Sequence, residues 1–254
     1  MQTKNGKPNT ENGPLLIIFA KEPCPGQVKT RLCPHLSPEA AARLYQCFLE
    51  DILEEMGRLP DVSLAVAYAG ALTVKPRLSA NQYRPPDIAL KLFRKLVHPG
   101  VMLFTQEGAG LSERLVRAFD WGFAKGFDAV LIRNSDSPDL PGELISAGGR
   151  ALARGGADLV LGPSPDGGYF LVGMKKSRPQ LFQGISWSSA AVLADTLEKA
   201  RESSLTVHLL PSWPDIDSIA DLRAFAANPP LPDAPGRRSY LCARELLRSV
   251  ISNQ

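Results

Sequence analysis

The chain lacks several features that would place it in a specialised class of protein. None of its four cysteines forms a Cys-x-x-Cys pair, and its three histidines are scattered, so the spacing typical of a zinc site is absent. Its 254 residues contain no apolar window of about 18 residues or more, which excludes a transmembrane helix. A formal net charge of +3 is too small to indicate a nucleic acid polymer or a membrane surface as partner.

The remaining composition is that of an ordinary globular protein. Hydrophobic residues make up 44% of the chain and charged residues 22%, which is enough apolar surface for a large core. Residues 1–14 are polar and contain no apolar run, so we expect a disordered leader rather than a signal peptide, followed by a single domain over 15–254. We interpret the cysteines as reduced thiols and expect a cytoplasmic protein.

Apolar runs alternate with helical patterns along the chain. The run LLIIFA at 15–20 is typical of a strand buried on both faces, as in a parallel sheet. Ser37, Pro38 and Glu39 form a helix start, with a cap, a proline and an acid in the first turn. The alternation predicts βαβ units and a largely parallel sheet in an α/β protein. Strands are predicted at 15–20, 62–68, 101–106, 128–133, 158–162, 169–174 and 207–210, and helices at 37–56, 89–97, 111–125, 141–154, 188–200, 219–227 and 240–250.

A basic loop follows the first predicted strand. It contains Lys21, Lys29 and Arg31 beside Gly26, and cations with a glycine suit the oxygens of a phosphate group. The spacing is neither that of a P-loop nor Gly-x-Gly-x-x-Gly, so a solvated basic loop is an equal alternative. Ligands of open α/β sheets bind beyond the carboxyl ends of the strands, which is where this loop lies.

Aspartates occur in two further loops that are expected at the same edge. Asp136 follows the strand at 128–133 by a few residues, and its carboxylate is a hard ligand suited to Mg²⁺ or Mn²⁺. Asp139 is expected to cap the next helix instead. Asp215 and Asp217 could complete a metal site with Asp136, while Asp217 or Ser218 could also cap the helix that follows.

The run Asp166-Gly167-Gly168 lies between two predicted strands. Asp-Gly is a strong hairpin signal, so a simple turn is the first interpretation. The alternative makes Asp166 a base or a ligand of an acceptor hydroxyl, with Gly167 and Gly168 on the acceptor side. Trp187 precedes the helix at 188–200, for which Ser188 is the expected cap, and it packs there or lines the acceptor pocket.

Taken together, the blocks resemble a family of small bacterial proteins similar to nucleotide-diphospho-sugar transferases, with the glycosyltransferase-A fold. They occur in the family's order and span about residues 15 to 225. In the last block Ser218, Ile219 and Ala220 replace the Thr-Pro-Glu that is usual in the family. The matching blocks are Phe-x-Lys-x-Pro-x-x-Gly-x-Val-Lys-Thr-Arg-Leu at 19–32, Ser-Asp-Ser-Pro-Asp-Leu at 135–140, Asp-Gly-Gly-Tyr at 166–169, Ile-Ser-Trp-Ser at 185–188 and Asp-Ile-Asp-Ser-Ile-Ala-Asp-Leu at 215–222.

This resemblance implies a three-layer α/β/α sandwich, with a mostly parallel sheet, that binds a nucleotide diphosphate. It implies that Asp136 is the counterpart of the metal-binding aspartate, and that Lys29 and Arg31 face the nucleotide phosphates. The blocks are more distantly similar to those of guanylyl- and cytidylyltransferases, which share a basic first loop and a late metal-binding aspartate.

Three functions are compatible with these residues. The first is transfer of a sugar from a nucleotide-sugar to a small-molecule acceptor, with Mg²⁺ or Mn²⁺ held by Asp136 and Asp217 and with Asp166 acting on the acceptor hydroxyl. The second is nucleotidyl transfer from a nucleoside triphosphate to a phosphorylated small molecule. The third is a nucleotide-binding protein without catalysis.

Overall fold

The computed structural model describes residues 13–70, 86–154 and 156–252. The predicted leader at 1–14 therefore lies outside the described residues, apart from Gly13 and Pro14. The strands are β1 (Leu15–Lys21), β2 (Ser63–Ala69), β3 (Met102–Thr105), β4 (Val130–Arg133), β5 (Leu159–Pro163), β6 (Tyr169–Met174) and β7 (Val207–Leu209). The helices are α1 (Pro38–Gly57), α2 (Pro86–Leu96), α3 (Leu111–Ala124), α4 (Gly142–Ala153), α5 (Val192–Glu202), α6 (Ile219–Ala227) and α7 (Arg237–Ser252), with short 3-10 helices η1 (Thr30–Leu32) and η4 (Pro179–Phe182).

The described strands form one seven-stranded sheet in the order β3-β2-β1-β4-β6-β5-β7. Pairing is parallel except for β6, which runs antiparallel to both β4 and β5. The hairpin that joins β5 to β6 contains the Asp166-Gly167 turn, as the sequence predicts. The predicted mostly parallel sheet is thus confirmed, and its one reversed strand places the hairpin at the carboxyl edge of β4.

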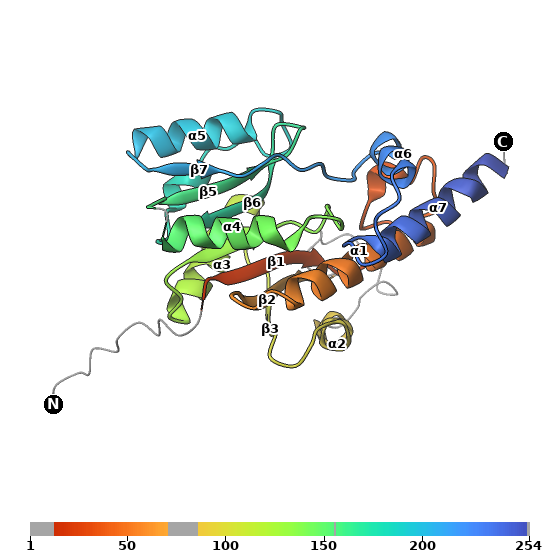
Figure 1. Ribbon diagram of the computed structural model, residues 1–254, viewed down its shortest axis with the longest axis horizontal. Coiled ribbons are helices and arrows are strands. Elements are labelled where there is room, and N and C mark those ends of the chain that lie inside the picture. Colours follow the sequence, from red (N-terminus) through yellow and green to blue (C-terminus); the bar gives the residue numbers. More distant parts are fainter. Residues whose placement is uncertain (1–12, 71–85, 155, 253–254) are drawn as a thin grey trace.

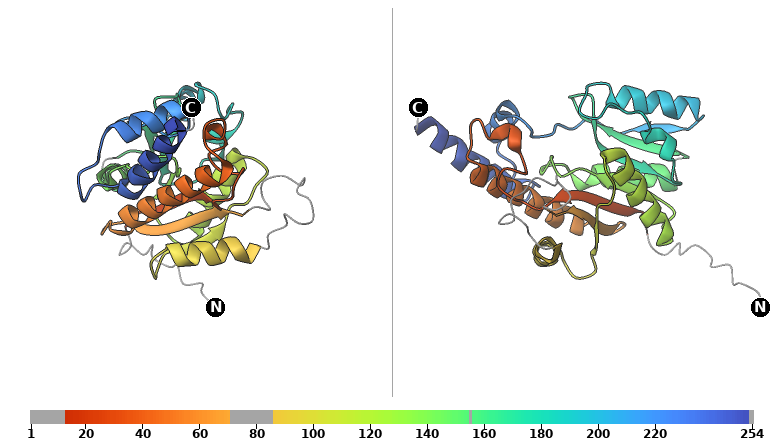
Figure 2. Two further views of the ribbon diagram at one scale, coloured as in Figure 1. Left: turned by 90° about the vertical axis from the view of Figure 1, so that its right-hand side faces the viewer. Right: turned by 180° about the vertical axis from the view of Figure 1, so that it is seen from behind.

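Both faces of the sheet are covered, because alternate residues of β1 enter different hydrophobic clusters. Leu16 and Ile18 pack in the cluster of α1 and α4, whereas Leu15 and Ile17 pack in the cluster of α3 and α5. All four side chains are fully buried, and each such burial contributes roughly 1.5–3 kcal/mol. The two views in Figure 2 show helices on both sides of the sheet. The three-layer α/β/α sandwich is therefore confirmed.

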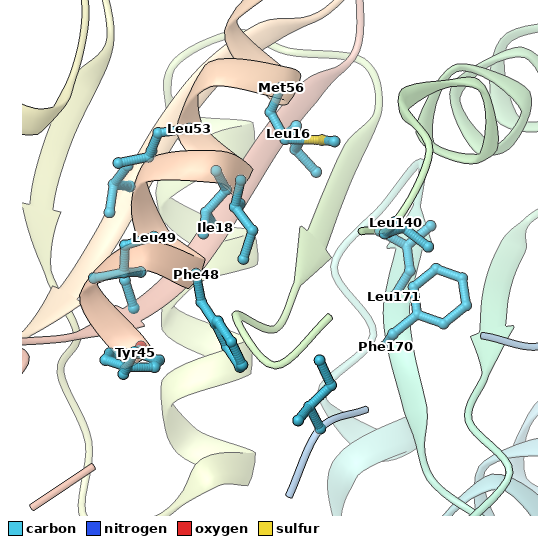
Figure 3. Packing of buried hydrophobic residues seen from close by; sticks show 14 of the residues in the cluster. Leu16, Ile18, Tyr45, Phe48, Leu49, Leu53, Met56, Leu140, Phe170 and Leu171 are labelled. Carbon is cyan, nitrogen blue, oxygen red and sulfur yellow. The ribbon is translucent and has the colours of Figure 1, made fainter. Parts of the chain in front are cut away.

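Helix α1 begins where the sequence predicts and extends past the carboxyl edge of the sheet (Figure 1). Its cap is Ser37, whose Oγ accepts a hydrogen bond of 3.1 Å from the Ala40 amide. Its inner face carries Phe48 and Leu49 into the cluster of Leu16 and Ile18 (Figure 3).

Helix α7 lies along α1 (Figure 1). It is attached at its first turn by the buried Asp51 of α1. The Asp51 carboxylate accepts from the Ser239 amide at 2.7 Å and from the Ser239 hydroxyl at 2.6 Å. The predicted helix at 240–250 therefore starts three residues earlier, at Arg237, because its cap comes from another helix.

Two predicted helix caps are wrong. Helix α5 begins at Val192 rather than at Ser188, because Ser188 has φ +66° and lies in a turn before the helix. Asp139 does not cap α4, whose N-cap is Pro141; its Oδ1 instead accepts from the Trp213 indole nitrogen at 3.1 Å. In contrast Ser218 does cap α6, within a capping box closed by Asp221.

The segment between β7 and α6 crosses the carboxyl edge of the sheet, where it meets the loops that follow β4 and β5. The Trp213 amide donates to the Pro163 carbonyl and the Ile216 amide donates to the Asp136 carbonyl, both at 3.0 Å. Figure 1 shows this connection running from β7 to α6, which lies beyond the strand ends. Within the described ranges, no helix combines the length and apolar character needed to cross a membrane.

Candidate active site

Lys29 is the centre of a cluster of charged groups at the carboxyl edge. Its backbone is left-handed, with φ 47° and ψ 38°, immediately before η1. Its ammonium donates to Asp136 Oδ1 at 2.5 Å, to the Ile216 carbonyl at 2.8 Å and to Asp217 Oδ1 at 3.1 Å. A lysine ammonium has three donors, so all of them are used. The strained backbone is therefore matched by three charge-assisted contacts from two distant segments.

The structure thus brings Asp136 and Asp217 together, as the sequence predicts for two loops at one edge. The side chain of Lys29 is 3% exposed, whereas those of Asp136 and Asp217 are 36% and 39% exposed. The ammonium consequently lies beneath the two carboxylates, which keep one side toward solvent. Burial opposes the charged forms of both Asp136 and Lys29, but the attraction between them is stronger. The pKa of Asp136 is therefore below the usual value for an aspartate, and the pKa of Lys29 is above the usual value for a lysine.

Arg31 contacts one member of this pair, Asp217, from the solvent side. Its Nη1 lies 3.3 Å from Asp217 Oδ2, and its side chain is 67% exposed. Such an exposed pair is screened by water and salt and contributes at most about 1 kcal/mol. The guanidinium of Arg31 therefore remains able to move toward an anionic ligand.

Asp215 lies near Asp136 and connects three segments. Its carboxylate accepts from Asn134 Nδ2 at 3.0 Å, from Ser137 Oγ at 2.6 Å and from Ser164 Oγ at 3.2 Å. Burial, together with the nearby charge of Asp136, raises the pKa of Asp215 to about 6 against these hydrogen bonds. In this structure Asp215 therefore holds the loops together, and its predicted part in a metal site stays a prediction.

Arg133, at the end of β4, is a second buried cation. It is 1% exposed and donates to the Asn134 carbonyl at 3.0 Å and to the Ser137 carbonyl at 2.7 Å. Burial lowers its pKa to about 10, a value at which it still carries its charge at neutral pH. These two bonds fix the curvature of the loop that carries Asp136. The sequence carries a signal for Arg133, because a charged residue ends an otherwise apolar strand, but that signal does not indicate which groups the guanidinium contacts.

The exposed sides of Asp136 and Asp217 fit a hard divalent cation. Asp136 Oδ2 accepts no hydrogen bond within the described part of the chain, so it has free lone pairs. Mg²⁺ typically keeps several waters and is bound by one or two carboxylates together with substrate phosphates. Among the residues placed in the structure, no group of three or more His, Cys, Asp or Glu side chains could hold a metal by itself. A metal here would therefore need oxygen ligands from a substrate.

The hairpin predicted to contact the acceptor lies beside the turn that carries Trp187. Asp166 is exposed, and its Oδ1 accepts a hydrogen bond of 3.0 Å from the Gly168 amide, which is the expected turn geometry. The Gly167 carbonyl accepts from the Leu193 amide at 2.9 Å. Trp187 packs edge-on against Tyr169, with ring centroids 6.2 Å apart. These contacts connect the hairpin to the start of α5 and to the turn that carries Trp187.

Trp187 is also fixed from its other side. Its indole nitrogen donates to Ser112 Oγ at 2.7 Å, and that hydroxyl donates to the Phe182 carbonyl at 2.6 Å. The ring is therefore held in place before any ligand arrives, which is the packing role that the sequence left open. An acceptor contact by Trp187 stays a prediction.

The other two residues of the basic loop lie at its surface. Lys21 ends β1, its side chain is exposed, and its charge acts on Asp136. Gly26 has φ +73° and is exposed, with nothing within 4 Å of the position that a Cβ would take. Their predicted contacts with a nucleotide stay predictions.

The raised pKa of Asp215 predicts a specific dependence of stability on pH. A carboxyl that binds its proton more tightly when folded stabilises the protein below pH 3.8 and loses this contribution as pH rises to about 6. We expect the unfolding free energy of the wild type, relative to that of Asp215→Asn, to fall by roughly 1–3 kcal/mol as pH rises across this interval. Urea unfolding of both proteins in EDTA measures this difference. A constant difference between the two proteins from pH 4 to 7 would contradict this assignment.

Comparison with known proteins agrees with this fold. Residues 53–189 match the family described as "Uncharacterized protein conserved in bacteria (DUF2064)". We found no match among curated proteins. The chain is 32% identical to a putative nucleotide-diphospho-sugar transferase from Desulfovibrio desulfuricans G20, over 95% of this chain and 98% of that one, with a TM-score of 0.81.

Two less similar structures share the fold alone. A cytidylyltransferase from Leptospira borgpetersenii is 14% identical, with a TM-score of 0.50 over 96% of this chain and 98% of that one. The inositol-1-phosphate CTP transferase from T. maritima is 15% identical, with a TM-score of 0.51 over 92% and 96%. With the family match covering more than half of the chain and a similar structure covering nearly all of it, this protein belongs to the DUF2064 family.

Proposed function

We propose that the protein is a metal-dependent glycosyltransferase that transfers a sugar from a nucleotide-diphospho-sugar to a small-molecule acceptor. The observation that carries this proposal is the pair of half-exposed carboxylates, Asp136 and Asp217, gathered above Lys29 at the carboxyl edge. The description of the Desulfovibrio desulfuricans protein as a putative nucleotide-diphospho-sugar transferase supports the same donor class.

Asp136 and Asp217 would hold Mg²⁺ or Mn²⁺, which when bound neutralises charge on the two phosphates of the leaving nucleotide. Arg31 is the side chain best placed to add to this effect, because it is exposed and adjacent to Asp217. A second cation close to the diphosphate stabilises the charge that develops as the bond to the sugar breaks. Lys29, whose three donors are taken, acts through the two carboxylates in this conformation.

Asp166 is the proposed base for the acceptor hydroxyl. Its carboxylate is exposed, and the turn uses only Oδ1, as an acceptor from Gly168. Oδ2 therefore has lone pairs for the hydroxyl proton as its oxygen attacks the sugar. Ser164, two residues earlier, is bonded to Asp215, so the hairpin is fixed relative to the carboxylate pair.

Nucleotidyl transfer is the second candidate, and the fold shared with a cytidylyltransferase and with an inositol-1-phosphate CTP transferase is the observation that favours it. The same carboxylates and cations would then act on the α-phosphate of a nucleoside triphosphate, with pyrophosphate as the leaving group. The released product separates the two reactions: a nucleoside diphosphate for glycosyl transfer, and pyrophosphate for nucleotidyl transfer.

A thermal-shift screen of nucleotides, each with and without Mg²⁺ or Mn²⁺, tests the proposal. A ligand at about 100 times its dissociation constant adds roughly 2.7 kcal/mol of stability. We expect a metal-dependent increase in melting temperature with one nucleoside diphosphate or its sugar conjugate, and release of that diphosphate when acceptors are added. An increase in melting temperature only with a triphosphate would favour nucleotidyl transfer. Binding without turnover over a broad acceptor screen would favour a non-catalytic protein. No increase with any nucleotide would contradict both transfer reactions.

We also propose a cytoplasmic location. All four cysteines lie in the described part of the chain and none is in a disulfide, which suits a reducing compartment. Mass spectrometry of the protein purified without reductant should find four free thiols.

A further inference from the structure

We propose that the ammonium of Lys29 is the resident counter-ion of the Asp136–Asp217 pair, so that a divalent cation enters this site only together with a diphosphate. This inference rests on the proposed function, because it describes how the same site is loaded. It concerns the order of binding, which neither the family nor the fold specifies.

Lys29 is fixed in its position. Its ammonium contacts three acceptors and is 3% exposed, and it also lies over the ring of Phe48, 5.2 Å from the centroid. If the ammonium left this position, three charge-assisted hydrogen bonds would break. The carboxylates of Asp136 and Asp217 and the Ile216 carbonyl would then lose their donor. Lys29 therefore acts as a permanent cation rather than as a mobile side chain.

The negative charges of Asp136 and Asp217 are already compensated within the protein. Asp136 and Asp217 form ion pairs with Lys29 and Arg31, so two negative charges are already matched by two positive ones. The exposed Lys21 adds a further positive charge that acts on Asp136. A divalent cation alone would thus enter a site without net attraction, and its loss of hydration would not be compensated.

A diphosphate ligand brings the negative charge that a divalent cation needs at this site. A diphosphate brings at least two negative charges and oxygen ligands, so the metal and the diphosphate compensate each other as they bind. The neighbouring carboxylates of Asp215 and Asp221 add negative charge, which the buried guanidinium of Arg133 and the ammonium of Lys21 offset. Both carboxylates are also held by hydrogen bonds: Asp215 accepts from three side chains, and Asp221 accepts from the Ser218 amide at 2.7 Å in the capping box of α6.

A titration of the protein with Mn²⁺ in the absence of nucleotide tests directly whether Lys29 acts as the counter-ion. Binding is measured as the loss of the EPR signal of free Mn²⁺. We expect Lys29→Met to bind Mn²⁺ at least about tenfold more tightly than the wild type, because the pair then keeps an uncompensated negative charge. Lys29→Arg retains the charge and should bind as weakly as the wild type. The double variant Lys29→Met with Asp136→Asn should lose the gain.

Arg31→Met provides a second variant in case Lys29→Met does not fold. Its side chain is 67% exposed, so its removal leaves the core intact. Because solvent screens this charge, the expected gain in Mn²⁺ affinity is smaller, about threefold. A folded Lys29→Met or Arg31→Met protein without any gain would overturn the proposal.

The same titration is repeated on the wild type with UDP, CDP, GDP or ADP present. We expect at least one of them to tighten Mn²⁺ binding to the protein by about tenfold or more, as charge compensation requires. Tight Mn²⁺ binding to the wild type both alone and with nucleotide would overturn the counter-ion role and leave the proposed function intact. No Mn²⁺ binding to any variant, with or without nucleotide, would overturn both.

Discussion

Replacing Asp136 by asparagine is expected to lower the affinity for a metal–nucleoside diphosphate complex by at least about a hundredfold. Asp136 is the carboxylate whose Oδ2 has no partner within the described residues, and it is held by Lys29 at one oxygen only. An amide keeps the shape of the side chain but removes the charge that a hard cation needs, and loss of one charged ligand typically costs about 2–5 kcal/mol. Isothermal titration calorimetry with Mg²⁺ present measures the loss.

Asp166→Asn is the matched control for this experiment. The hydrogen bond from the Gly168 amide is retained by the amide oxygen, so the hairpin stays folded. We expect the affinity for the nucleotide to remain within about twofold of the wild type, while transfer falls by a factor of about 10²–10⁴, as for loss of a general base. Equal losses of binding in both variants would contradict the separate roles of the two aspartates.

Gly167→Ala is expected to destabilise the protein by about 3 kcal/mol or more. Gly167 has φ +88°, and a Cβ there would lie 2.2 Å from the carbonyl oxygen of Ala190. The left-handed backbone costs an alanine roughly 1–2 kcal/mol, and the clash with a backbone atom adds a further cost because neither segment can move freely. Urea unfolding gives the change in unfolding free energy.

Gly26→Ala separates these two costs. Gly26 also has a positive φ, +73°, but a Cβ there would meet nothing within 4 Å. Only the backbone cost applies, so we expect a loss of about 1–2 kcal/mol. If both variants lost the same stability, the contact between the hairpin and the turn at Ala190 would not be as close as the structure has it.

The sheet could be predicted because its signals are local. The apolar run of β1 carries the alternation that sends Leu16 to one face and Ile17 to the other, and Ser37 and Pro38 define the start of α1. The two failed caps have a physical reason. At Ser188 the chain adopts a left-handed turn, and at Asp139 a tertiary partner, Trp213, competes for the carboxylate.

The candidate site could be predicted only in part. That Asp136 and Asp217 meet follows from the rule that strand ends share an edge. The position of Lys29 beneath them does not follow, because its partners lie 107 and 188 residues away in sequence, and no local pattern tells a buried lysine from a solvated one. The same holds for Asp215, whose three donors come from two other loops.

We propose that a metal held by Asp136 and Asp217 binds a nucleotide diphosphate at the carboxyl edge. The most direct test is an anomalous difference map of crystals grown with Mn²⁺ and the nucleoside diphosphate selected by the thermal-shift screen. We predict one Mn²⁺ peak beside the carboxylates of Asp136 and Asp217, with the diphosphate of the nucleotide next to it. A nucleotide bound elsewhere, or bound here without Mn²⁺ while the Lys29 ammonium leaves the two carboxylates and contacts its phosphates directly, would contradict this assignment.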